Sequence, residues 1–383
     1  MKRTFIPFNK PYVSGREALY VQQVLASGTL SGDGVFTQKC HGFFEQKYGF
    51  NKVLLTSSCS DALEMSAILI DTKAGDEIII PSYTFVSTAN AFLLRGAKII
   101  FADSEVDTPN LDVSKIEGLI TSKTKAIVCV HYAGIACDLD QLLYLCEKYH
   151  LYLIEDAALS IDSYFRGKPL GSFGHLAAFS FHETKNITSG EGGMLVVNEK
   201  KFIERAEIIR DKGTNRSKYT RGEIAKYGWV DIGSSFLPSH LTAAVLFAQI
   251  EQLETIQQQR KKLWQRYYSG LKSLHDQGFI RLPQLPEYSY NNAHIFYLVC
   301  KNETIRTELI ATLSKNNIGA SFHYSSLHTS VYFAARHDGR ALPNSDLYTN
   351  CLVRLPMFFE LNLEDIDAIC QVITNYFIDT SKN

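Results

Sequence analysis

From residue 50 to about residue 200, short continuous apolar runs alternate with longer segments of helical spacing. Buried strands of a parallel sheet have this composition because both of their faces are covered, and the helical segments supply the crossovers between them. The pattern predicts an α/β fold built on a mostly parallel, seven-stranded sheet. The expected strands are Val53–Thr56, Glu77–Pro81, Lys98–Ala102, Ala126–His131, Leu151–Asp156, Ala177–His182 and Gly193–Asn198.

The pattern changes after about residue 235. A strand-like run at His294–Cys300 and helices from Glu303 and through Leu363 indicate a second, smaller α+β unit. We expect a large domain at residues 1–240 and a small domain at residues 241–383. One long predicted helix precedes the strand-like run, and its apolar positions are Leu246, Ile250, Leu253, Ile256, Leu263, Tyr267 and Leu271.

Charge and cysteine content exclude several classes of protein. Lysine and arginine number 39 and the acids 40, a net charge of −1, which disfavours a nucleic-acid or membrane-surface binder. The 8 cysteines form no CxxC pair, so neither a zinc site nor a disulfide framework is indicated. The start of the chain has no apolar signal-peptide run, and the longest apolar stretch, residues 126–137, is too short to span a bilayer. We therefore expect a cytoplasmic protein without a metal.

Lys185 follows a predicted buried strand in the string Phe179-Ser-Phe-His-Glu-Thr-Lys-Asn, and a glycine cluster, Gly190-Glu-Gly-Gly, follows it. The strand end fixes the backbone, the glycines admit a bulky planar group, and burial favours the neutral amine that attacks an aldehyde. These features are typical of a lysine that forms a Schiff base. A surface lysine in a polar turn is the alternative interpretation.

A second strand ends in the acids Glu155 and Asp156, whose side chains point in opposite directions, so one of them faces the crevice at the strand ends. A buried carboxylate there holds a pyridine nitrogen protonated, which makes pyridoxal 5'-phosphate (PLP) an electron sink. An acid that caps the following turn is the alternative interpretation.

A third strand turns into a helix through Thr56-Ser-Ser-Cys-Ser-Asp. Small hydroxyl residues at a helix start offer backbone N–H groups and hydroxyls to a phosphate, although a plain helix cap has the same composition. Ser180 adds another hydroxyl. Phe85 or Tyr83, at the end of the neighbouring strand, is a candidate to stack on a planar ring, unless it is a core residue.

These strings resemble the DegT/DnrJ/EryC1/StrS sugar aminotransferases, which are PLP enzymes of the aspartate aminotransferase fold, fold type I. The resemblance runs over nearly the whole chain and is closest to the 4-aminotransferases of dTDP-linked 4-keto-6-deoxy sugars. It is carried by Ser31-Gly-Asp-Gly, Pro81-Ser-Tyr-Thr-Phe-Val-Ser-Thr, Val130-His-Tyr-Ala-Gly, Phe179-Ser-Phe-His-Glu-Thr-Lys-Asn, Lys212-Gly-Thr-Asn-Arg-Ser, Asp231-Ile-Gly-Ser-Ser and Phe322-His-Tyr.

The resemblance implies a role for each matching residue. Lys185 is the PLP-linked base and Asp156 the partner of the pyridine nitrogen, while Phe85 stacks on the ring. The implied phosphate ligands are Cys59, Ser60, Ser180 and, from the other subunit of a homodimer, Ser235. In the wider family an asparagine stands at position 235 and a glutamine at position 159, where this chain has Leu159. On the sugar-nucleotide side, His323, Tyr324 and His328 match the substrate motif of the family imperfectly, and a packed, hydrogen-bonded histidine is the alternative for each histidine. Asn215 and Arg216 are candidates for the diphosphate, because a guanidinium suits phosphate oxygens, with a solvated surface charge as the alternative for the arginine.

The expected activity is therefore amino transfer from L-glutamate to a nucleotide-linked 4-keto-6-deoxy sugar, with pyridoxamine 5'-phosphate (PMP) formed between the two halves. A sugar dehydratase of the same family has histidine in place of Lys185 and is disfavoured. A nicotinamide oxidoreductase needs a glycine fingerprint after its first strand, and Gly32-Asp-Gly follows no strand. A non-catalytic regulatory protein of the same fold is a further alternative. The C4 epimer, C4 or C3 amination, and dTDP or UDP stay open.

Overall fold

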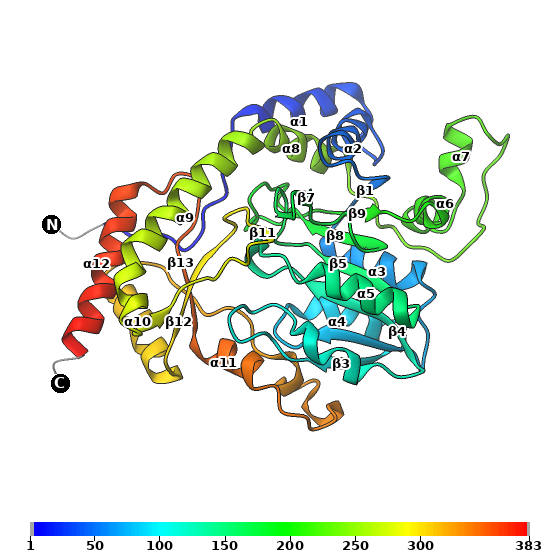
Figure 1. Cartoon of the computed structure of the whole chain (residues 1–383). Helices are drawn as coiled ribbons and strands as arrows, with labels where there is room; N and C mark the ends of the chain where they lie inside the picture. The colour runs from blue at the N-terminus through cyan, green and yellow to red at the C-terminus, as the bar shows by residue number, and fades with distance from the viewer. Residues whose placement is uncertain (1–3, 381–383) are drawn as a thin grey trace.

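The computed structural model describes residues 4–380, and its centre is a seven-stranded sheet in the order β1-β9-β8-β5-β4-β2-β3 (Figure 1). β9 pairs antiparallel with both of its neighbours, whereas the other pairs in the sheet are parallel. The α/β class and the seven predicted strands are thus confirmed. Their bounds are β1 Val53–Thr56, β2 Glu77–Pro81, β3 Lys98–Ala102, β4 Thr124–Val130, β5 Tyr152–Asp156, β8 Leu176–Ser180 and β9 Gly193–Val197.

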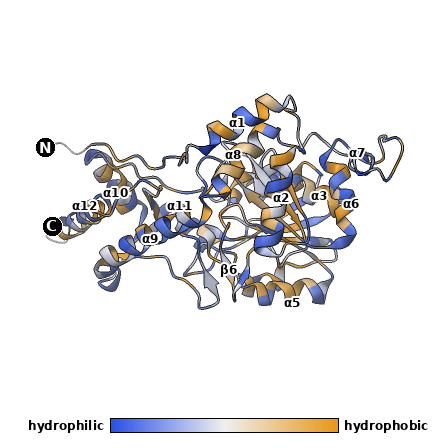
Figure 2. Ribbon diagram, turned by 90° about the horizontal axis from the view of Figure 1, so that it is seen from above, coloured by the Kyte–Doolittle hydropathy of each residue, from blue (hydrophilic) through white to orange (hydrophobic). Residues whose placement is uncertain are grey.

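Alternate residues of each strand face the two helical layers, which explains why the runs are apolar throughout. On β4, Ala126 and Val128 pack in the core beneath α3, α4 and α6, whereas Ile127 and Cys129 pack on the other face beneath α5. Figure 2 shows the hydrophobic strands inside and mixed colouring along α5 at the surface. The helices of the two layers are α3 Cys59–Leu69, α4 Val86–Leu93, α5 Leu139–Tyr149 and α6 Lys200–Arg210, with α1 Arg16–Ser27, α2 Val35–Tyr48 and α8 His240–Ile250 beside the β1–β9 edge.

The prediction of a single long helix in this region is wrong. The structure has two helices there, α8 and α9 Leu253–Asp276. The chain turns at Glu251 and Gln252, yet Ile250 and Leu253 still pack in one core cluster. The apolar spacing therefore runs on through the break and conceals it.

α9 leads away from the large sheet toward a second core built on the antiparallel sheet β10-β12-β13 (Figure 1). Ile6, near the start of the chain, joins this core and bridges to Ile318. The division of the chain at residue 240 stays a prediction. The bounds are β10 Ile280–Arg281, β12 Phe296–Cys300, β13 Leu352–Leu355, α10 Glu303–Lys315, α11 Pro343–Cys351 and α12 Leu363–Thr380.

Short elements complete the described chain. A small sheet of order β11-β6-β7 joins Ser289–Tyr290, Tyr164–Phe165 and Lys168–Pro169, and α7 spans Arg216–Thr220. The 3-10 helices are η1 Val113–Lys115, η2 Glu117–Leu119, η3 Tyr132–Gly134, η4 Leu327–Thr329 and η5 Ala334–Arg336. Among residues 4–380, no helix has the length and apolar character needed to cross a membrane.

Candidate active site

A cavity of about 790 Å³ lies at the carboxyl ends of the parallel strands, between the large sheet and the loop that follows α10. Strand ends are where open α/β sheets place their ligands, because connecting loops diverge there. Eight of the residues proposed from the sequence line this cavity together: Cys59, Ser60, Phe85, Asp156, Ser180, Lys185, His323 and Tyr324.

Lys185 lies in the turn after β8, where its backbone N–H donates to the His182 carbonyl over 2.9 Å. The next residue, Asn186, is fully engaged and anchors the turn: its amide donates to Gln257 over 2.7 Å, and its carbonyl oxygen pairs with the His294 ring over 2.7 Å. Burial lowers the pKa of Lys185 from 10.5 to about 8. About a tenth of this amine is therefore neutral and nucleophilic at pH 7, far more than for a lysine of ordinary pKa.

Asp156 ends β5 and directs its carboxylate toward the same cavity. Thr88 Oγ1 donates to Asp156 Oδ2 over 2.7 Å, the Ala158 N–H donates to Oδ1 over 3.2 Å, and Thr84 lies 3.0 Å behind Thr88. Burial raises the pKa of Asp156, and the Thr88 and Ala158 donors oppose that rise. The sequence interpretation missed Thr88, although it stands in the first turn after a strand that ends at the crevice.

The N-terminus of α3 forms a cradle of donors at the cavity wall. Ser58 caps the helix by accepting the Asp61 N–H over 3.1 Å, so the N–H groups of Cys59 and Ser60 in the first turn have no acceptor inside the helix. A Cβ at Gly193 would lie 2.5 Å from the Cys59 nitrogen, so only glycine permits this close approach of β9. Free N–H groups at a helix start suit a phosphate.

Aromatic side chains form the opposite wall. Phe85 precedes α4 and is 55% exposed, so one face of its ring is bare, and Tyr324 lies 6.2 Å from it, centre to centre. His323 stacks on Tyr324 at 3.6 Å, and Tyr132 Oη pairs with the His323 ring over 2.7 Å. A bare aromatic face beside an amine and a carboxylate matches the needs of a planar heterocycle.

Four predicted site residues lie elsewhere. His328 is buried behind the cavity and pairs with Ser82 over 2.7 Å. Arg216 lines a separate cavity of about 460 Å³, Asn215 precedes α7 and accepts the Gly228 N–H over 2.8 Å, and Ser235 is exposed and bridges to Asp211. The role implied for Ser235 concerns a second subunit and stays a prediction, as do the roles of Asn215 and Arg216. Leu159 lines the main cavity.

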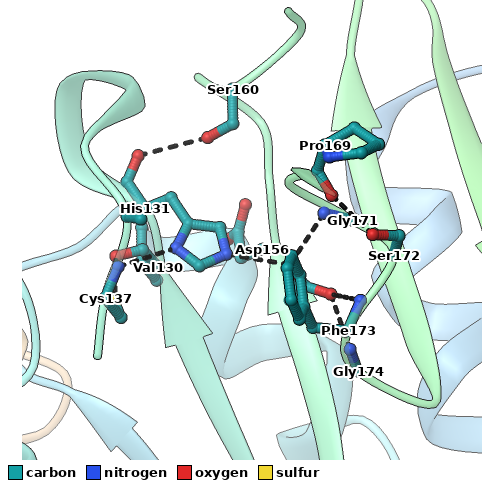
Figure 3. A network of polar contacts seen from close by, with 12 residues as sticks. Val130, His131, Cys137, Asp156, Ser160, Pro169, Gly171, Ser172, Phe173 and Gly174 are labelled. Carbon is teal, nitrogen blue, oxygen red and sulfur yellow. Dashed lines mark hydrogen bonds and ion pairs between the residues drawn. The ribbon is translucent and has the colours of Figure 1, made fainter. Parts of the chain in front are cut away.

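Glu155, the neighbour of Asp156, is fully buried and does not line the cavity. It belongs to a network of polar contacts in which Figure 3 labels His131 and the loop with Gly171, Phe173 and Gly174. Its carboxylate accepts backbone N–H groups of Gly171, Phe173 and Gly174 over 2.6 to 2.8 Å. The Cys137 N–H donates to His131 Nδ1, which leaves the proton on Nε2, 3.0 Å from Glu155. His131, the last residue of the predicted strand Ala126–His131, therefore helps to fix the end of β5.

Cys129, His131 and Cys137 come within 4.8 Å of one another in this buried network. Both ring nitrogens of His131 are already engaged by the protein, so a metal would have to break one of those hydrogen bonds. The donor set of the main cavity is different in kind: an amine, a carboxylate, a hydroxyl-rich helix start and a bare ring. That set fits PLP.

The comparisons with known proteins indicate the family of this chain. The chain is 29% identical over 381 residues to an uncharacterised protein of Methanocaldococcus jannaschii, which covers 97% of this chain and 98% of the relative. Two solved structures are each 25% identical and cover 98% of this chain: the aminotransferase TlmJ of Streptoalloteichus hindustanus (TM-score 0.90, all of that chain) and S. venezuelae DesV in complex with a ketimine intermediate (TM-score 0.89, 99% of that chain). The model of one family matches residues 11–374. This protein belongs to the DegT/DnrJ/EryC1/StrS aminotransferase family.

Proposed function

We propose that this aminotransferase is a PLP-dependent transaminase that converts dTDP-4-keto-6-deoxy-D-glucose and L-glutamate into dTDP-4-amino-4,6-dideoxy-D-galactose and 2-oxoglutarate. The observation that carries the proposal is the meeting of Lys185 and Asp156, from the ends of β8 and β5, in one cavity. Family membership and the ketimine complex of DesV support amino-transfer chemistry at such a site.

PLP, when bound, supplies an aldehyde that links reversibly to amines and a ring that withdraws electrons from the neighbouring carbon. In this chain Lys185 Nζ would hold the cofactor between turnovers and carry a proton to and from the reacting carbon. Its lowered pKa lets the amine accept a proton and release it near neutral pH.

Asp156 would keep the pyridine nitrogen protonated, and Thr88 holds that carboxylate in place. The first-turn N–H groups of Cys59 and Ser60, with the Ser180 hydroxyl, would bind the cofactor phosphate. Phe85 would cover one face of the ring. Each of these groups belongs to a residue that lines the cavity.

On the substrate side, we propose that His323 and Tyr324 contact the keto sugar from the aromatic wall. Asn215, Arg216 and Ser235 lie away from this cavity within one chain, so their proposed roles require the partner subunit of a homodimer. The net charge of −1 is compatible with a nucleotide-sugar substrate, because one small anion needs a few placed donors and not a basic surface.

Incubation of the protein with PLP, L-glutamate and dTDP-4-keto-6-deoxyglucose tests the proposal, with NMR of the sugar product. An axial amine at C4 is the expected result. An equatorial amine or amination at C3 would replace the substrate assignment within the same family, and absence of any amino sugar together with a colourless protein would favour a non-catalytic protein of this fold.

A further inference from the structure

Arg354 is a charged residue in the otherwise apolar strand β13, and its side chain lines the same cavity as Lys185. Its Nε is buried and has no hydrogen-bond partner. Within residues 4–380, no carboxylate lies at ion-pair distance from its guanidinium group. The cavity therefore contains a permanent cation that the described chain does not neutralise.

Two arginines that are buried elsewhere in the described chain, Arg260 and Arg210, have acceptors for their guanidinium groups. Arg260 donates to the carbonyl oxygens of Ala293 and His294, the first over 3.1 Å. Arg210 pairs with both carboxylate oxygens of Asp33, one of them at 2.6 Å. Burying a cation without a partner is costly, and a planar guanidinium suits the paired oxygens of an anion. The Nε of Arg95 is also buried and without a partner, but Arg95 does not line the cavity, whereas Arg354 does. The unpaired guanidinium of Arg354 therefore points to an anionic ligand in the cavity.

The surroundings hold this guanidinium in position. The ring of Phe8 lies 4.8 Å from Arg354 Cζ and supports one face of the group. The Arg354 N–H donates to the Ser321 carbonyl over 2.7 Å, which fixes the strand beside the loop that carries His323. The Tyr83 hydroxyl donates to the backbone carbonyl of His323, and the Tyr132 hydroxyl pairs with its ring.

The position of Arg354 decides which anion it suits. Its side chain and that of Lys185 line the same cavity, and its charge helps to lower the pKa of Lys185. A cofactor phosphate has its own cradle at α3. The diphosphate of a sugar nucleotide is attached at C1, on the far side of the ring from the reacting C4, whereas the α-carboxylate of an amino acid is one bond from the reacting carbon.

We propose that Arg354 binds the α-carboxylate of the amino donor and of the oxo acid formed from it. This inference rests on the proposed transaminase function and names the group that selects an amino acid in the first half of the reaction. The keto sugar has no carboxylate. Arg354 therefore serves the donor half and leaves the sugar half without this contact.

The first test measures binding, apart from turnover, with glutarate as the probe. Calorimetry on the PLP-loaded protein compares the wild type with Arg354→Gln and Arg354→Lys. Loss of a charged, paired contact is expected to weaken glutarate binding by about 30-fold in the glutamine variant. The lysine variant keeps the charge without the planar donor pair, and about 10-fold is expected. Arg266→Gln, which removes an exposed arginine paired with Asp367 on α12, is the matched control and should bind like the wild type.

The second test separates the halves of the reaction by absorbance. Conversion of bound PLP to PMP by glutamate should slow at least as much as glutarate binding weakens in Arg354→Gln. Conversion of bound PMP to PLP by the keto sugar should stay within about threefold of the wild type. Equal slowing of both halves, slowing of the sugar half alone, or unchanged glutarate binding overturns the inference.

Two further outcomes are a glutamine variant that does not fold and a wild type without activity. If Arg354→Gln does not fold, the lysine variant stands in its place, and wild-type glutarate affinity there overturns the inference. If the wild type performs neither half of the reaction, the proposed function fails. The glutarate measurement still reports on the carboxylate site, so the two failures are distinguishable.

Discussion

Glu155 and Asp156 are adjacent acids on one strand, both buried, and they have opposite surroundings. Three backbone N–H groups and the His131 ring donate to Glu155, whereas Asp156 has one hydroxyl and one backbone donor and faces the cavity. The polar groups around the two carboxylates, on opposite sides of the end of β5, differ in the same way. On the Glu155 side the protein satisfies its own polar groups, and on the Asp156 side it leaves an amine, a helix start and a guanidinium for a ligand.

This difference shows how one strand serves both stability and chemistry. Gly171, with a φ of +91°, opens the loop whose N–H groups bind Glu155, and a Cβ there would lie 2.5 Å from the Phe179 ring. The loop and His131 fix the strand end, and the next residue then has a defined direction. Rigid support on one side is what allows unpaired groups to be held in place on the other.

The largest effect is expected on the cavity side, at Lys185. Lys185→Ala removes the amine that holds the cofactor and moves the proton, so amino-sugar formation should fall by about 10⁴-fold or more. NMR quantification of the product measures the loss. Circular dichroism should show an unchanged fold, because removal of a buried amine costs no protein hydrogen bond. Activity within tenfold of the wild type would contradict the assigned role.

Replacing Asp156 and Glu155 in turn by their amides tests the difference between the two acids directly. Asp156→Asn removes the charge that keeps the pyridine nitrogen protonated, and activity should fall by about 10² to 10³-fold. The free energy of unfolding should change by less than about 1 kcal/mol, since an amide oxygen still accepts one of the two hydrogen bonds. Thr88→Val, which removes only the donor to Asp156, should give a smaller loss of activity, and Thr88→Ser should restore it.

Glu155→Gln is expected to show the reverse. Because all donors around Glu155 point at its oxygens, the amide NH₂ must face one of them, and the protein should lose about 3 kcal/mol of unfolding free energy. Urea unfolding followed by circular dichroism measures this loss. At a temperature where the variant is folded, its rate should lie far closer to the wild-type rate than that of Asp156→Asn. Equal effects of the two amides on stability would refute the comparison.

The sequence predicted those site residues that stand at the end of a strand or just after it. Lys185 and Asp156 were found because continuous apolar runs mark the strands and polar residues mark their ends. Thr88 and Arg354 were not, because each reaches the cavity through a pairing of distant segments: Thr88 meets Asp156 across 68 residues, and Arg354 arrives on a strand of the second sheet. A lone arginine in the apolar run Leu352–Leu355 is the available sequence signal.

The pH dependence of cofactor capture sharpens the account of Lys185. Burial lowers its pKa to about 8, so the neutral fraction should rise roughly tenfold from pH 6 to pH 7, reach one half at about pH 8 and level off above about pH 9. The rate at which the cofactor-free protein takes up PLP, followed by absorbance, should have this profile. In Arg354→Gln the midpoint should move to higher pH, since the arginine charge helps to lower the pKa. A wild-type midpoint near 10 would contradict the burial argument.

The lowered pKa of Lys185 also predicts how the stability of the cofactor-free protein depends on pH. The unfolded lysine keeps its proton up to about pH 10.5, whereas the folded one loses it near pH 8. Between these values the unfolded state binds more protons, so the contribution of Lys185 to the stability of the cofactor-free protein rises with pH. Lys185→Met has no such group, and the difference in unfolding free energy between the two proteins should grow in favour of the wild type across that range.

The smallest expected effect concerns Leu159, which lines the cavity where the wider family has glutamine. Leu159→Gln restores a polar side chain beside the cofactor site, and one neutral hydrogen bond is worth about 1 kcal/mol. Loss of PLP on dialysis should therefore slow by up to about fivefold, as measured by the absorbance that the protein retains. Leu159→Met keeps the volume and the apolar character and should behave like the wild type. If both variants lose PLP at the wild-type rate, position 159 does not contribute to the grip on the cofactor, and the unpaired groups around Lys185 and α3 must account for all of it.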